Sequence, residues 1–173
     1  MCAWDLRRNE VASLHDSPFE RDGDDPHITF DERKNGPGTV ALIYGGEALS
    51  ERIDQLERRE EWSGYLFPSR QSATGHITGG TVQARFKRLA EQVNVRVYGE
   101  EPTSKMGRRF WYTMYNQAMN DLLKNLDVIA AERGSSDPSV VLKNYLSEYE
   151  RREYRREFMR KRLVEVFAWT DRI

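Results

Sequence analysis

The chain is poor in the residues that form disulfides and metal sites. Its one cysteine, Cys2, excludes an internal disulfide and a zinc site built from several cysteines. Its three histidines, at positions 15, 27 and 76, are widely separated in the sequence and predict no metal centre. A length of 173 residues suits one domain of ordinary size, and we expect that domain to bury a real hydrophobic core.

Long apolar runs are missing as well. No stretch approaches the roughly 18 apolar residues that span a bilayer, and the first ten residues lack the apolar centre of a signal peptide. Charged residues make up 32% of the chain and the mean hydropathy is −0.79, values that are typical of a soluble, helix-rich protein. These features predict an intracellular protein with no membrane partner.

The net charge of −1 hides an uneven distribution. Residues 151–162 contain seven basic residues and two glutamates, and arginine outnumbers lysine by 21 to 6 in the whole chain. Arginine binds phosphate with a planar fork of donors, so the ratio is compatible with a nucleic-acid partner. The base composition of the genome or a salt-rich host explains the ratio equally well.

The hydrophobic pattern predicts an α+β fold, a mostly α-helical domain with a small antiparallel sheet near its N-terminal third. Two strands are expected over 27–30 and 39–43, joined by an Asn-Gly-Pro-Gly turn. Apolar residues at helical spacing indicate helices over 6–14, 50–62, 81–93, 104–123, 126–132 and 138–149. There is no internal repeat.

The helix expected over 81–93 has an apolar and a basic side. Thr81 is its expected N-cap. The residues expected to face inward are Val82, Phe86, Leu89 and Val93, and those expected to face mostly outward are Arg85, Lys87 and Arg88.

Two segments in the first third of the chain carry candidate chemistry. Arg7 and Glu10 lie three residues apart on the first expected helix, so the carboxylate can orient the guanidinium one turn away. Lys34 lies in the turn between the two strands. A surface ion pair and a solvated turn lysine are the ordinary explanations of these two segments.

A third segment begins the helix expected from residue 104. Lys105 and Arg108 are three residues apart on one face of its first turn, so both can reach one anion. The helix dipole and the unpaired N–H groups of that turn add affinity for the anion. The alternative is a helix whose charged first turn precedes a buried aromatic body.

The fourth segment is Gly-Ser-Ser-Asp-Pro-Ser at 134–139, followed by Tyr145. In this order the four segments resemble the catalytic motifs of the tyrosine recombinases, also called phage integrases. Lys105 replaces the histidine that is usual in the second motif, as in archaeal branches of the family. Asp5 stands where the family usually has a small residue such as glycine. Ser135 or Ser136 stands where it has a histidine or a tryptophan.

The resemblance implies a catalytic set and a role for its members. The set is Arg7, Lys34, Lys105, Arg108, Ser135 and Tyr145. Arg7 and Arg108 would bind the non-bridging oxygens of a DNA phosphate, and Lys34 would protonate the leaving 5′ oxygen. Tyr145 would be the nucleophile, with Tyr149 and Tyr154 as rivals. The residues expected to contact DNA are Arg85, Lys87, Arg88 and Arg109.

The resemblance also implies a function, which is site-specific cleavage and rejoining of double-stranded DNA. A 3′-phosphotyrosyl bond would store the energy of the cut bond, so no metal and no nucleotide cofactor is implied. The family assembles on DNA, so we expect self-association there as a dimer or tetramer, at the nucleoid inside the cell. Residues 1–150 would form the catalytic domain and residues 151–173 a basic amphipathic tail. The chain begins almost at the first arginine, so we do not expect the family's N-terminal core-binding domain in it.

Three other functions stay open at this stage. A type IB topoisomerase uses the same chemistry to relax supercoils, and the departures from the third motif suit an inactive DNA-binding relative. A helical interaction module with a basic tail is the third. The tail itself has an apolar stripe, formed by Phe158, Leu163, Val166 and Phe167 with Trp169 beyond. We expect that stripe to dock, either on its own domain or on a neighbouring subunit.

Overall fold

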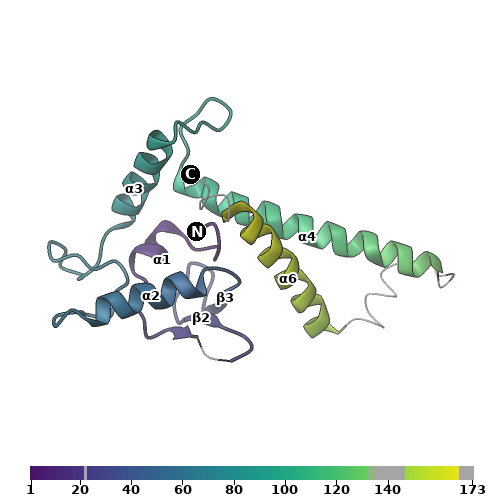
Figure 1. Cartoon of the computed structure of the whole chain (residues 1–173), viewed down its shortest axis with the longest axis horizontal. Coiled ribbons are helices and arrows are strands. Elements are labelled where there is room, and N and C mark those ends of the chain that lie inside the picture. The colour runs from purple at the N-terminus through teal and green to yellow at the C-terminus, as the bar shows by residue number, and fades with distance from the viewer. Residues whose placement is uncertain (22, 133, 135–146, 168–173) are drawn as a thin grey trace. The chain divides into compact units, whose positions relative to one another are not determined.

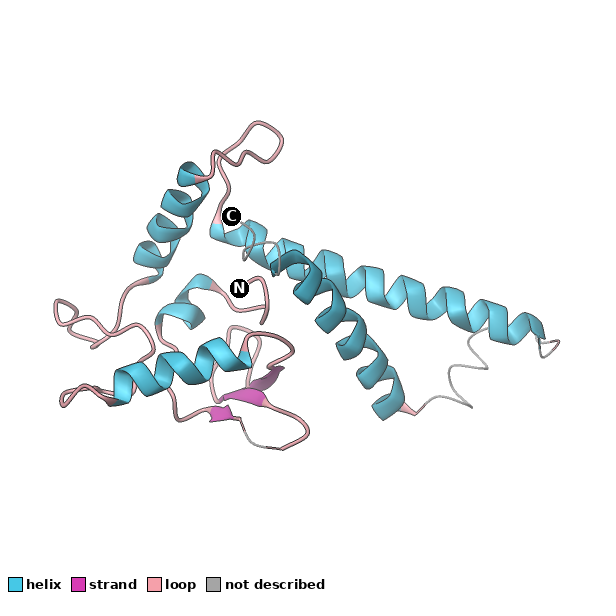
Figure 2. Cartoon of the chain, in the orientation of Figure 1, coloured by secondary structure: helices cyan, strands magenta, loops and turns pink. Residues whose placement is uncertain are grey.

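The computed structural model of the chain describes residues 1–21, 23–132, 134 and 147–167 (Figure 1). Helices dominate these ranges, and the strands lie in the N-terminal third (Figure 2), so the predicted α+β class is confirmed. The elements are α1 (Arg8–Ala12), β1 (Phe19–Glu20), β2 (His27–Phe30), β3 (Gly38–Ala41), α2 (Gly46–Glu57), α3 (Gly79–Gln92), α4 (Ser104–Glu132) and α6 (Glu148–Phe167).

The chain divides into two compact units, Met1–Trp111 and Tyr112–Ile173. Unit 1 contains the sheet, α1 to α3 and the first turns of α4, and unit 2 contains the rest of α4 together with α6. The division expected from the sequence, a catalytic domain over 1–150 and a tail over 151–173, stays a prediction.

The core of unit 1 forms where one face of the sheet meets α2. The sheet is antiparallel with the order β1-β2-β3, and Ile28 on β2 lies between Phe19 on β1 and Val40 on β3. These three side chains share one face and are buried in one cluster with Leu49 and Ile53 of α2. The β2–β3 hairpin was expected from the sequence, whereas the two residues of β1 are too few to give a periodic signal.

Helix α3 differs from the expectation in its cap and in its orientation. The Thr78 hydroxyl, and not that of Thr81, caps the helix and accepts a hydrogen bond from the Thr81 N–H at 3.1 Å. Val82 is buried with Ala12 of α1, because the N-terminal half of α3 packs on α1. Leu89 and Val93, which were expected to face inward, are 63% and 67% exposed.

Helix boundaries shift in two other places. Helix α2 begins after Gly45, whose φ of 82° is left-handed, and therefore starts four residues before the expected range 50–62. Helix α4 is continuous from Ser104 to Glu132, where a break near residue 125 was expected. The helix expected over 138–149 lies mostly outside the described residues.

Unit 2 has its own buried side chains, spaced by four residues as one helix face requires. On α4 these are Ala118, Leu122, Leu126 and Ala130, and on α6 they are Met159 and Leu163. The Asn125 side-chain amide donates to the Tyr154 hydroxyl at 2.8 Å, which joins the two helices.

The Arg155 guanidinium adds to this contact between α6 and α4. It lies 5.9 Å from the centre of the Tyr115 ring and 3.9 Å from the sulfur of Met119. The charged C-terminal helix therefore docks on its own chain. Leu163 is buried as the apolar stripe predicts, but Val166 is 46% exposed, and Trp169 lies outside the described residues.

We predict that Leu163→Ala lowers the free energy of unfolding by about 2–5 kcal/mol, because the side chain is fully buried and its removal leaves a cavity. Urea denaturation followed by circular dichroism measures the loss. Val166→Ala, on the same helix but half exposed, is the matched control and should cost less than about 1 kcal/mol. Equal losses for the two variants would contradict the observed orientation of α6.

Candidate functional site

The first motif lies at the start of α1, where Arg7 is the N-cap residue. The Glu10 carboxylate accepts a hydrogen bond from the Arg7 backbone N–H at 2.7 Å and another from the Arg7 guanidinium at 2.9 Å. The spacing of these two residues had predicted the ion pair, and the structure confirms it. The Arg7 side chain is 29% exposed, so one part of it is held by Glu10 and another part reaches solvent.

The hairpin is joined to the first motif through Arg33. Its Nε and Nη2 atoms donate to the two oxygens of the Glu10 carboxylate at 3.0 and 3.1 Å. Its guanidinium also lies 5.1 Å from the centre of the Phe30 ring. Lys34, the predicted general acid, is the next residue and is exposed in the β2–β3 turn. Sequence analysis missed Arg33, for which its place beside Lys34 was the only signal.

Glu10 thus accepts from two guanidiniums, one on α1 and one on the hairpin. Burial alone would raise the pKa of its carboxyl. Hydrogen bonds from Arg33 and from the backbone and side chain of Arg7 outweigh that effect and lower the pKa to about 2. Glu10 is therefore ionised at neutral pH and can hold both arginines in place.

The second motif begins α4 and lies against the N-terminal segment of the chain. The Ser104 N–H donates to the side-chain oxygen of Gln83 on α3 at 3.0 Å, which fixes the start of α4. A Cβ atom at Gly107 would stand 3.0 Å from the sulfur of Cys2, so glycine allows this close approach. Lys105 is exposed on the same turn.

Arg108 is held by a carboxylate that sequence analysis assigned to no role. Its Nε atom donates to one oxygen of Asp5 at 2.6 Å and its Nη2 atom donates to the other at 3.1 Å. The two residues are 103 positions apart in the sequence, and Asp5 is two residues before Arg7. Folding therefore brings the second motif to the segment that carries the first.

Three of the four predicted segments thus meet in unit 1. Glu10 joins the first helix to the hairpin, and Asp5 joins the first segment to α4. Lys34 and Lys105 belong to these segments, with their side chains exposed. Ser135 and Tyr145 lie outside the described residues, so their place relative to the arginines stays a prediction.

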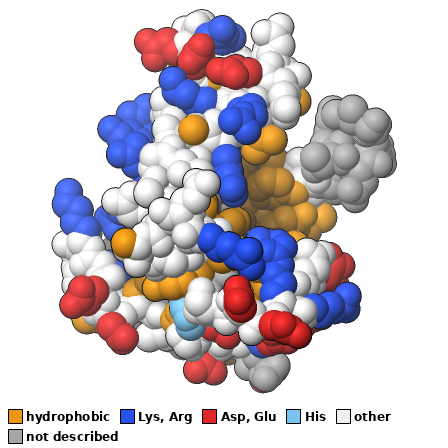
Figure 3. Space-filling view, turned by 90° about the vertical axis from the view of Figure 1, so that its left-hand side faces the viewer, with side chains coloured by type: hydrophobic (Ala, Val, Ile, Leu, Met, Phe, Trp, Pro, Cys, Tyr) orange, Lys and Arg blue, Asp and Glu red, His pale blue; other side chains and the backbone are white. Residues whose placement is uncertain are grey.

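The predicted DNA-contacting residues lie on two helices. Arg85 and Arg88 are exposed on α3, and Arg109 is exposed on α4. Lys87 forms an ion pair with Glu101 at 3.3 Å, so part of its charge is neutralised. On the face shown in Figure 3, Lys and Arg side chains are spread from the top to the lower right, and acidic side chains gather at the top and along the bottom.

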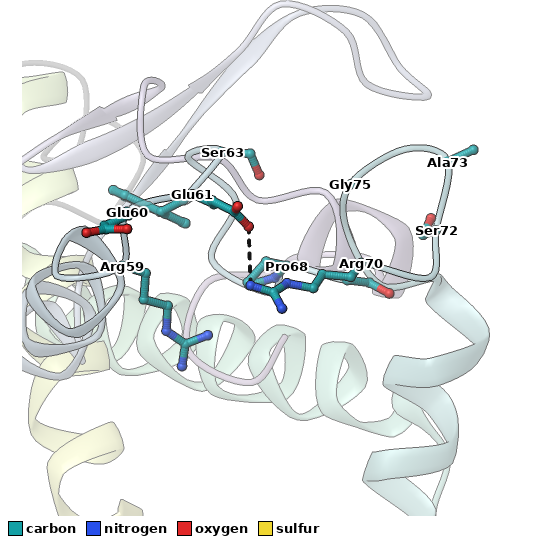
Figure 4. Close-up of a pocket in the computed structure, with 11 residues that line it drawn as sticks. Arg59, Glu60, Glu61, Ser63, Pro68, Arg70, Ser72, Ala73 and Gly75 are labelled. Carbon is teal, nitrogen blue, oxygen red and sulfur yellow. Dashed lines mark hydrogen bonds and ion pairs between the residues drawn. The ribbon is translucent and has the colours of Figure 1, made fainter.

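A pocket of about 1010 Å³ opens between the end of α2 and the loop that follows residue 68 (Figure 4). An ion pair between Arg70 and Glu61, 3.3 Å long, crosses it. Both of those side chains are more than four-fifths exposed, and none of the predicted site residues lines the pocket. We assign no chemistry to it.

The described residues contain neither a cluster of metal ligands nor a membrane-spanning helix. Within the described ranges, no three His, Cys, Asp or Glu side chains come together as metal ligands do. Nor does any helix in the described part of the chain have the length and apolar character of a membrane span.

We predict that Glu10→Gln lowers the free energy of unfolding at pH 7 by about 1.5–3 kcal/mol, because two guanidiniums lose their charged acceptor. The folded-state pKa of about 2 lies below the ordinary value of 4.5, so the carboxylate stabilises the fold above pH 4.5. That contribution is lost as the pH falls through about 2.

The difference between wild type and Glu10→Gln should therefore shrink between pH 5 and pH 2, as measured by urea denaturation at each pH. Glu61→Gln, in the exposed pair with Arg70, is the control and should change stability by less than about 1 kcal/mol at every pH. A difference for Glu10→Gln that does not depend on pH would contradict the role of its charge.

Comparison with known proteins gives one result that bears on the fold. No protein-family model and no curated protein sequence matches this chain. A solved crystal structure, that of XerA recombinase, is similar to it with a TM-score of 0.50 and 16% identity over 88% of this chain. The match covers 53% of the recombinase, so this chain spans about half the length of that protein. At this identity the likeness is one of fold, and the chain has a recombinase-like α+β fold.

Proposed function

We propose that this chain carries the catalytic residues of a tyrosine recombinase, which cuts a strand of double-stranded DNA and rejoins it through a 3′-phosphotyrosyl intermediate. The main observation behind the proposal is the ion pair between Arg108 and Asp5. Asp5 is two positions before Arg7 in the sequence, so this pair brings the second motif to the segment that carries Arg7. The fold shared with XerA recombinase supports the same conclusion.

The two arginines have the surroundings that phosphate binding requires. Arg7 donates to the Glu10 carboxylate and Arg108 to the Asp5 carboxylate, and both side chains are partly exposed. A guanidinium has five N–H donors, so the same group can donate to a carboxylate and to a phosphate. Donors that are already oriented do not have to move during the reaction. They therefore stabilise the negative charge that grows at a five-coordinate phosphorus.

In the proposed reaction the Tyr145 oxygen attacks the phosphorus and the bond to the 5′ oxygen breaks. The phenol loses its proton, and Lys34 supplies one to the leaving oxygen. The position of Lys34 in an exposed hairpin turn beside the anchored Arg33 suits a side chain that reaches toward DNA. Attack of a second strand on the phosphotyrosyl bond reverses these steps, so rejoining consumes no nucleotide and needs no metal.

Binding to DNA would use the exposed basic residues of α3 and α4. DNA phosphates would be contacted by Arg85 and Arg88 of α3 and by Arg109 of α4. Lys87 would have to break its ion pair with Glu101 before it could contact a phosphate. Such contacts make affinity fall steeply with salt. Self-association on DNA is part of the same proposal, since strand exchange requires two cut duplexes.

The nucleophile is tested with Tyr145→Phe on a nicked duplex that traps the covalent adduct. We expect the variant to form no adduct and to bind DNA as wild type does, because it loses only the attacking hydroxyl. Adduct formation is measured by denaturing gel electrophoresis and the attachment site by peptide mapping.

Tyr149→Phe is the matched control and should keep the wild-type rate. An adduct on Tyr149 or Tyr154 would show that the assignment is wrong, and no adduct at all in the wild type would favour a DNA-binding protein without activity.

The paired arginines are tested with Arg7→Ala, Arg108→Ala and the double variant on the same substrate. Each single change should slow cleavage by about 10²–10³-fold, since each removes one preorganised donor from the phosphate. Because the two guanidiniums act on one phosphate, the double variant should be slower by less than the product of the single effects. Strictly multiplicative losses, or a wild-type rate in either single variant, would contradict a shared phosphate.

A further inference from the structure

Asp5 combines two features that are seldom found together in one side chain. Its carboxylate accepts two hydrogen bonds from the Arg108 guanidinium, at 2.6 and 3.1 Å. The Asp5 side chain is 17% exposed and the Arg108 side chain 23%. Its backbone has a φ of 49°, in the left-handed region that favours glycine. Aspartate tolerates this region better than most residues, but at some conformational cost. A carboxylate therefore occupies a position where the backbone by itself favours glycine.

The paired oxygens of Asp5 meet the Nε and Nη2 edge of Arg108, which is the geometry of a bidentate carboxylate–guanidinium pair. Such a pair fixes the plane of the guanidinium as well as its position. The Arg7 guanidinium donates a single hydrogen bond to Glu10, at 2.9 Å, in the same unit. Each of these two cations of the proposed site thus has a carboxylate partner.

We propose that Asp5 is a positioning residue of the reaction, which holds the Arg108 guanidinium in the orientation that the transition state requires. The inference rests on the proposed function. It predicts that loss of the Asp5 charge slows cleavage but does not weaken DNA binding. The negative charge of Asp5 offsets the positive charge of Arg108, so it weakens the attraction for DNA in the ground state. The orientation it imposes acts on the cleavage step, where a small displacement of a catalytic group has a large effect.

The test compares Asp5→Asn and Asp5→Gly with the wild-type chain on the nicked trapping substrate. Asparagine keeps the size of the side chain and its tolerance of a left-handed backbone, but it loses the charge. Glycine removes the carboxylate and relieves the backbone. Both variants should cleave about 10- to 100-fold more slowly at saturating DNA. Their dissociation constants for DNA, measured by fluorescence anisotropy, should be equal to that of the wild type or lower.

Two controls separate positioning from a general structural role. Glu61→Gln removes a carboxylate from an exposed ion pair and should leave cleavage and binding unchanged. In an Arg108→Ala background, Asp5→Asn should cause no further loss of cleavage, because Asp5 acts through that guanidinium. A purely structural role would instead slow the Arg108→Ala variant again and would weaken DNA binding.

Several results would overturn the inference. A wild-type cleavage rate in Asp5→Gly would show that the position needs only its backbone conformation. Faster cleavage in that variant would show that Asp5 competes with the phosphate for the Arg108 guanidinium. Slower cleavage with weaker binding and a lower melting temperature would show a structural role. If the wild type forms no adduct, the proposed function fails and the inference fails with it. If the wild type forms the adduct and Asp5→Asn does so equally fast, the inference alone is wrong.

Discussion

The Glu10 carboxylate accepts hydrogen bonds from two guanidiniums that come from different elements, and the arrangement of the candidate site depends on it. Arg7 is the N-cap of α1, and Arg33 lies in the loop between β2 and the hairpin turn. Because Glu10 binds both, a helix of only five residues keeps a fixed place relative to the sheet. Burial makes an unpaired charge costly here, so each of the three groups requires the others.

The same pairing of carboxylate and guanidinium recurs at Arg108, and it affects the electrostatics of the region. The group formed by Arg7, Arg33 and Arg108 with the two carboxylates has a formal charge of +1, whereas the three guanidiniums alone carry +3. In the proposed function, the two carboxylates weaken the attraction for DNA and at the same time fix the guanidinium donors. That balance suits the proposed chemistry, in which the growing charge of the transition state has to be met more strongly than the phosphate of the substrate.

Much of the fold could be predicted from the sequence, because it follows from local patterns. The β2–β3 hairpin, the start of α4 after Pro102 and the pairing of Arg7 with Glu10 all arise from turn residues or from helical spacing. The orientation of α3 could not be predicted in this way. Its apolar residues at 89 and 93 have helical spacing with Val82, but α1 covers only the N-terminal half of the helix. Periodicity indicates which residues share a face and does not indicate how much of that face another element covers.

By itself the sequence determined the fold class, the β2–β3 hairpin, most of the helices and the cationic residues that the proposal uses, since these depend on neighbours within a few positions. Only the tertiary structure decided which charges meet. Asp5 looked like a departure from a family pattern, and it became the partner of Arg108 once folding closed a separation of 103 residues. Arg33 was not singled out in the sequence, and its hydrogen bonds to Glu10 connect the hairpin to α1. Ion pairs between distant segments have no local signature, because the long-range contact that creates them depends on the packing of the whole unit.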